Sequence, residues 1–160
     1  MGGIPNITNC TIAANFHRGV SSLEPTITNS IVYLNGLGSD VVQIESNSAR
    51  VTYTDVEGGW PSEGNIDADP YFATTGFWDT NRTPENVDDD FWVEGDYRLQ
   101  SQVGRWDPVS QTWVQDVVTS PCIDAGNPDS DWTAEPQPSG GRINMGAYGD
   151  TAKASKSPTD

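Results

Sequence analysis

Basic residues are scarce in this chain of 160 residues. Eight lysines and arginines stand against 23 aspartates and glutamates, which gives a formal net charge of −15. A nucleic acid releases its counterions only to a protein that supplies cations in their place. The composition therefore argues against nucleic acid as a partner, and it favours cations or uncharged polymers such as glycans.

Long apolar runs are also missing. No stretch approaches the roughly 18 residues of a membrane-spanning helix, so we expect no membrane insertion. No basic segment followed by an apolar one comes after Met1, so the sequence as given has no secretory signal peptide. Because the chain opens directly in a strand-like pattern, we expect it to be part of a longer protein.

Cysteine and histidine are too few for a structural zinc site. Cys10 and Cys122 are the two cysteines, neither lies in a CxxC motif, and His17 is the single histidine. We interpret the two thiols as small buried hydrophobic groups. A disulfide between them is the alternative.

Turn-forming and aromatic residues are abundant by contrast. The chain contains 16 glycines, 11 prolines, six tryptophans and five tyrosines. Disordered chains are poor in aromatic residues, and no segment shows the 3.6-residue apolar spacing of a helix. The composition therefore predicts an ordered, loop-rich, all-β protein with a narrow core.

A repeat runs through the first sixty residues. The segment from Ile7 to Ile12 aligns with Ile27 to Val32 at an offset of 20, and Val51 to Val56 follows 24 residues later. Each unit is a short β-branched stretch with a polar corner. A period in the low twenties predicts a β-solenoid in which Ile7, Ile27 and Val51 stack in a single file.

The repeat ends near Trp60, and acidic, aromatic loop sequence follows. We therefore expect solenoid coils over 1–60 and closing coils or a cap over 61–150. Within the cap, a β-hairpin is expected near 104–115, where tryptophans flank a Pro-containing turn. The polar residues 151–160 predict a flexible tail.

Four motifs carry a resemblance to a known family: Gly64-Asn65-Ile66-Asp67-Ala68-Asp69-Pro70, Asp96-Tyr97-Arg98-Leu99, Ser120-Pro121-Cys122-Ile123-Asp124-Ala125-Gly126 and Gly146-Ala147-Tyr148-Gly149. In this order they resemble the closing coils of bacterial pectate-lyase-like proteins. The resemblance implies a right-handed parallel β-helix of about three coils, and a secreted or cell-surface location. It carries no catalytic residues with it, because the motifs are closing elements and a solenoid hosts many activities.

Acidic residues supply the enzymatic alternative. In a calcium-dependent polysaccharide lyase of this fold, Asp55 and Glu57 would be the carboxylates and Arg50 the base. Calcium ligands would come from Asp67 and Asp69, which flank a turn, and from Asp88 and Asp90 in an acidic run. The competing interpretation is that these side chains cap turns or face solvent.

Tryptophans supply the binding interpretation, since an exposed indole can stack on a sugar ring. The candidates for carbohydrate binding are Trp60, Trp92, Trp106 and Trp113. The alternative is that they pack loops over the end of the solenoid, because large rings provide buried area where aliphatic residues are few.

These observations favour a non-catalytic terminal segment of a secreted or cell-surface protein that presents or binds polysaccharide. The alternatives are the calcium-dependent lyase and a purely structural cap. An exposed first coil would leave unpaired strand edges, so we also expect an end-to-end homodimer.

Overall fold

The computed structural model describes residues 4–36 and 42–158 and shows an all-β chain, which confirms the predicted class. Its first half contains three short parallel ladders. The first comprises β1 (Asn6–Thr8), β4 (Thr26–Thr28) and β7 (Arg50–Thr52), and the second comprises β2 (Thr11–Ala13), β5 (Ile31–Tyr33) and β8 (Asp55–Val56). The third pairs β3 (Val20–Ser21) with β6 (Ile44–Glu45).

The registers of these ladders follow the sequence repeat. Ile7 pairs with Ile27, and Ile27 pairs with Val51, so the predicted single file of apolar residues is confirmed. Ile27 and Val51 are buried in one core cluster together with residues of the other two ladders. Apolar residues recurring at the repeat offset therefore meet strand on strand and exclude water between them.

Left-handed corners keep these strands to two or three residues. Asn9, Asn29 and Tyr53 have φ near +50° directly after the first ladder, and Ala14 and Leu34 have φ of 57° and 58° after the second. A residue with positive φ cannot continue a strand. The chain thus turns at equivalent positions in successive repeats.

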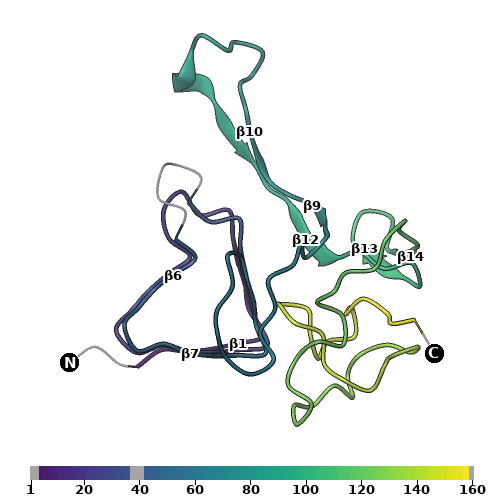
Figure 1. Cartoon of the computed structure of the whole chain (residues 1–160). Helices are drawn as coiled ribbons and strands as arrows, with labels where there is room; N and C mark the ends of the chain where they lie inside the picture. The colour runs from purple at the N-terminus through teal and green to yellow at the C-terminus, as the bar shows by residue number, and fades with distance from the viewer. Residues whose placement is uncertain (1–3, 37–41, 159–160) are drawn as a thin grey trace.

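The strands in the second half of the chain pair in antiparallel fashion. Strands β9 (Phe72–Thr74) and β12 (Asp96–Leu99) form the base of a ribbon, and β10 (Phe77–Asp79) and β11 (Phe91–Val93) extend it. Figure 1 shows this ribbon projecting away from the rest of the molecule. A 3-10 turn, Val87–Asp89, lies near its tip. Strands β13 (Arg105–Asp107) and β14 (Thr112–Val114) pair where the sequence predicts a hairpin.

The expected solenoid of three coils with closing coils is not what the structure shows. Within 4–36 and 42–158 the strands form small, separate sheets, and those after residue 71 are antiparallel. Residues 120–158 form turns, joined to the rest of the fold by single hydrogen bonds such as Ser120 N to Gln100 O, 3.0 Å, and Gly146 N to Asn29 O, 2.8 Å. The frequent Pro, Gly and Asp residues of this segment favour turns over ladders.

Residues 151–158, expected as part of a flexible tail, are packed against the body. Ala154, Ser155 and Ser157 are buried. Ser155 donates a hydrogen bond to the carbonyl of Leu99, and the carbonyl of Lys156 accepts one from Ser101 Oγ at 2.6 Å. Small side chains allow this close approach, which a polar composition alone does not reveal.

Candidate functional site

Asp55, on β8, is fully buried and lies where the first half of the chain meets the second. Its Oδ1 accepts a hydrogen bond from the Ala68 amide at 3.2 Å, and its Oδ2 accepts one from the Cys122 thiol at 3.1 Å. Burial raises the pKa of Asp55 to about 6, although both hydrogen bonds oppose the rise. Burial and the neighbouring Asp55 charge also raise the pKa of the Cys122 thiol.

The other acids of the predicted lyase set cap backbone amides. Glu57 Oε2 accepts from the Leu34 amide at 2.9 Å, Asp67 from the Gly58 amide at 3.1 Å, and Asp69 from the Tyr71 amide at 2.8 Å. Glu57 Oε2 also accepts from Gln43 Nε2 at 2.7 Å. These contacts match the turn-capping interpretation of the sequence.

Asp67 and Asp69 flank Ala68, whose amide donates to Asp55, so these three acids lie near one another, and all four acids affect Tyr33. Its pKa is raised to about 12, first by burial and then by the negative charges of four acids, which are Asp55, Glu57, Asp69 and Asp67. The structure therefore gathers acids that the sequence only places near one another along the chain. Arg50 lies apart from them, exposed on β7 in a different ladder, where it pairs with Thr26.

The two remaining calcium candidates lie in the projecting ribbon. Asp88 is exposed and Asp90 is half-buried, while Asp89 between them accepts hydrogen bonds from Thr83 Oγ1 at 2.8 and 2.9 Å. Among residues 4–36 and 42–158, no three His, Cys, Asp or Glu side chains are arranged to hold a metal ion. Calcium binding stays a prediction. The two cysteines are free.

Three of the predicted sugar-binding tryptophans, Trp60, Trp106 and Trp113, contact other parts of the chain. Trp60 packs against the core of the ladders and lines a pocket of about 400 Å³ that also includes Asp67. Trp106 and Trp113 form a cross-strand pair on β13 and β14, with ring centroids 5.5 Å apart. Lys153 Nζ lies 5.0 Å from the Trp106 ring centroid, and Lys156 Nζ lies 4.4 Å from that of Trp113.

The fourth, Trp92, belongs to an exposed aromatic surface. It faces Trp78 across β10 and β11, with ring centroids 5.7 Å apart. Trp78 is 53% exposed and Phe77 is 54% exposed. These three side chains, with Ala14 and Leu34 from the corners of the second ladder and with Thr75 and Gly76, line a pocket of about 350 Å³, here called the aromatic pocket.

Local sequence explains the shape of the aromatic pocket. Phe77-Trp78 and Phe91-Trp92 are two copies of one dipeptide, so strand pairing places indole opposite indole. At Gly76, a Cβ atom would overlap the Trp92 ring. Phe77 and Trp78 are not among the predicted sugar-binding residues, although the repeated Phe-Trp dipeptide is a signal that could have found them.

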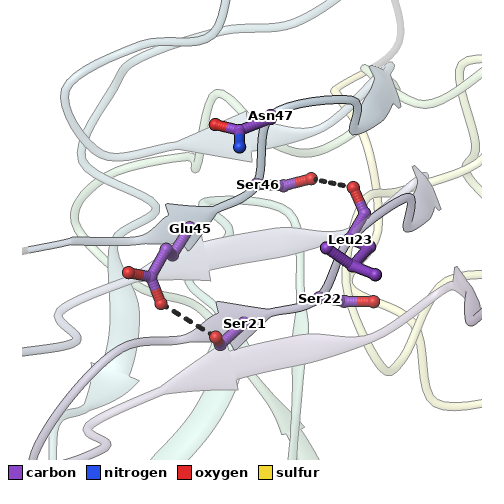
Figure 2. Close-up of a pocket in the computed structure, with 6 residues that line it drawn as sticks. All are labelled: Ser21, Ser22, Leu23, Glu45, Ser46 and Asn47. Carbon is purple, nitrogen blue, oxygen red and sulfur yellow. Dashed lines mark hydrogen bonds between the residues drawn. The ribbon is translucent and has the colours of Figure 1, made fainter. Parts of the chain in front are cut away.

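A polar groove of about 370 Å³ lies at the corners that follow β3 and β6 (Figure 2). Ser21 Oγ donates to Glu45 Oε2 at 2.9 Å, and Ser46 Oγ donates to the Leu23 carbonyl at 2.8 Å. Glu45 also pairs with Arg18 at 3.2 Å. Since these groups satisfy one another across the groove, the aromatic pocket is the stronger candidate for a ligand.

The segment that forms the projecting ribbon and the β13–β14 hairpin is similar to a known protein family. Residues 71–126 match the model of a family described as disaggregatase related. This segment contains β9 to β14, both tryptophan pairs and the aromatic pocket's Phe77, Trp78 and Trp92. Neither the curated proteins nor the solved structures gave a match.

The family match corrects the resemblance drawn from the sequence. Two of the four motifs, Asp96–Leu99 and 120–126, fall inside the matched segment, and the family is not the pectate-lyase-like one. That resemblance was therefore wrong. Asp, Gly and Pro make up 10 of the 22 residues of its motifs, and these residues encode turns that many loop-rich β proteins share.

No described helix is long and apolar enough to cross a membrane.

Proposed function

We propose that this chain is a non-catalytic, polysaccharide-binding segment of a secreted or cell-surface protein, and that the aromatic pocket binds the glycan. The observation that carries the proposal is the exposure of Phe77 and Trp78 beside Trp92 on a ribbon that projects from the body (Figure 1). A soluble domain rarely leaves such aromatic surface uncovered without an interaction to use it.

The dimensions and chemistry of the pocket support a sugar. Its volume of about 350 Å³ lies at the small end of ligand pockets and fits one or two sugar rings. The apolar face of a sugar ring stacks on an indole, while its hydroxyl groups stay in water. The match of residues 71–126 to the disaggregatase-related family supports placing the function in this segment.

The first half of the chain has a separate role in the proposal. Parallel pairing of three successive segments at offsets of 20 and 24 residues supports a short solenoid-like stack that holds Ala14 and Leu34 against the base of the ribbon. The enzymatic alternative has less support, because Asp55 is buried and Glu57 accepts two hydrogen bonds within the fold.

The test is binding of the purified chain to a panel of soluble polysaccharides, measured by affinity electrophoresis and calorimetry. We expect Trp78→Ala and Trp92→Ala each to weaken binding about tenfold, which corresponds to losing roughly 1.4 kcal/mol of stacking. Trp113→Ala is the matched control, because it removes an indole that Lys156 already covers.

Circular dichroism and thermal melts must show that the variants remain folded. Unchanged affinity in both ribbon variants, or equal loss in Trp113→Ala, would contradict the proposal. If no polysaccharide binds, the chain is better described as a structural cap.

A further inference from the structure

The chain contains two tryptophan pairs with nearly the same geometry. Trp106 and Trp113 lie opposite each other on β13 and β14, with centroids 5.5 Å apart and ring planes at 72°. Trp78 and Trp92 lie opposite each other on β10 and β11, at 5.7 Å and 70°. The two pairs are therefore matched sites within one molecule, and their surroundings can be compared directly.

Lysine ammonium groups occupy the first pair. Lys153 lies over Trp106 and Lys156 over Trp113, at 5.0 and 4.4 Å from the ring centroids. The backbone of Lys156 is held by the Gly104 carbonyl at 2.8 Å and by Ser101 Oγ at 2.6 Å. A cation over an indole face is attracted by the ring quadrupole. In this chain, the Trp106–Trp113 pair thus has an ammonium group near each indole face.

The second pair has no such cation among the residues that the structure describes, and it lies in an acidic stretch of the sequence. The cation–π contacts of residues 4–36 and 42–158 involve Tyr148, Tyr53, Trp106 and Trp113 as the rings. Between Phe77 and Glu94 the chain carries one base, Arg82, and six acids, which are Asp79, Glu85, Asp88, Asp89, Asp90 and Glu94. Within 4–36 and 42–158, no basic side chain lines the aromatic pocket.

Glu94 places a negative charge at the edge of the pair. Its Oε2 accepts a hydrogen bond from Trp92 Nε1 at 3.0 Å, and its side chain is exposed. An ammonium group over these rings would meet both the indole faces and this carboxylate. A uronate carboxylate at the same place would be repelled.

We propose that the aromatic pocket selects glycans with free, protonated amino groups, that is, polymers of amino sugars that are not N-acetylated. This inference rests on the proposed function, since it names the class of glycan that the same pocket binds. In this proposal, an ammonium group of the glycan lies above the ring of Trp78 or Trp92, as a lysine ammonium group lies above the ring of Trp106 or Trp113.

The experiment compares three oligosaccharides of equal length by calorimetry: a glucosamine oligomer with free amines at a pH where they are protonated, its N-acetylated form, and an oligogalacturonate. We expect the free-amine oligomer to bind about two- to fivefold more tightly than the acetylated one at low salt. The preference should decrease as salt rises, because exposed charges are screened. The oligogalacturonate should bind least.

Two charge variants test whether the preference for free amines comes from Glu94 beside the tryptophan pair or from attraction of any cationic glycan to the net charge of −15. Glu94→Gln keeps an acceptor for Trp92 Nε1 and removes the charge, so it should weaken binding of the free-amine oligomer more than binding of the acetylated one and thereby reduce the free-amine preference. Glu24→Gln, an exposed site far along the chain, is the matched control and should retain the preference.

The outcomes distinguish this inference from the proposed function. Equal binding of the acetylated and free-amine oligomers, or equal loss in both charge variants, overturns the inference and leaves polysaccharide binding in place. Tighter binding of oligogalacturonate also overturns it. Absence of binding by all three oligosaccharides and by the wider panel overturns both.

Discussion

At the scale of single residues, the carboxyl group of Asp55 has the most unusual environment. It is buried between the Ala68 amide and the Cys122 thiol, and burial raises its pKa to about 6. Its pKa in the unfolded chain is about 3.9. The folded state therefore binds a proton at this site more tightly than the unfolded state does.

This difference predicts a pH dependence of stability. Since the pKa of Asp55 is higher in the folded state, its protonated form stabilises the folded state relative to the unfolded state. This contribution to the free energy of unfolding is complete below about pH 4 and is lost as pH rises through about 6. Its total is about 3 kcal/mol. Asp55→Asn should remove this part of the pH dependence. Urea unfolding between pH 4 and 7 measures it, and the exposed Glu24→Gln serves as the control. An unchanged slope in Asp55→Asn would contradict the assignment.

At the scale of elements, the ribbon of β10 and β11 depends on a glycine. Gly76 precedes β10, and its missing side chain leaves room for the Trp92 ring to lie across the backbone. An added methyl group would overlap that ring, so either the ring or the strand must move. The geometry of the aromatic pocket is thus set by a residue that offers no side chain to a ligand.

Gly76→Ala should therefore disrupt the tryptophan pair and weaken glycan binding about tenfold, as the loss of either indole does. The exciton-coupled circular dichroism of the two indoles reports their pairing, and calorimetry reports the binding. Gly58→Ala is a comparison variant, because nothing lies near its Cβ position, although its φ of +82° makes the substitution strained. Retention of the full exciton signal in Gly76→Ala would contradict this account.

At the scale of the whole molecule, residues 151–158 tie distant segments together. Ser155 donates to the Leu99 carbonyl, the Ser155 carbonyl accepts from Asn144 Nδ2 at 2.8 Å, and Lys156 is hydrogen bonded to Ser101 and Gly104. The same segment supplies the lysines over Trp106 and Trp113. It is therefore part of the folded unit.

Truncation after Asp150 should lower the free energy of unfolding by about 3 kcal/mol or more, because several buried polar groups would lose their partners at roughly 1–3 kcal/mol each. Chemical denaturation of the two chains measures the difference. Ser155→Ala, which leaves only the Leu99 carbonyl unpaired, should show a smaller loss of about 1 kcal/mol. A truncated chain with unchanged stability would indicate the flexible tail expected from composition.

The all-β class and the strand register of the first half follow from the sequence alone. Ile7, Ile27 and Val51 recur at the repeat offset, and β-branched residues at such positions have one way to bury a common face. The paired strands of β13 and β14 were predictable for a similar reason, since a Pro-containing turn between two Trp-bearing segments closes a local hairpin. In each case the deciding contacts are local or periodic.

Which side chains are available to a ligand depends instead on how the chain folds. In the sequence Asp55 was a candidate catalytic carboxylate and Trp113 a candidate sugar-binding residue, but Cys122 and Lys156, far away along the chain, contact them. Phe77 and Trp78 stay exposed because the ribbon that carries them projects away from the rest of the molecule (Figure 1). Burial and exposure depend on contacts between segments distant in sequence, and no local pattern of residues encodes those contacts.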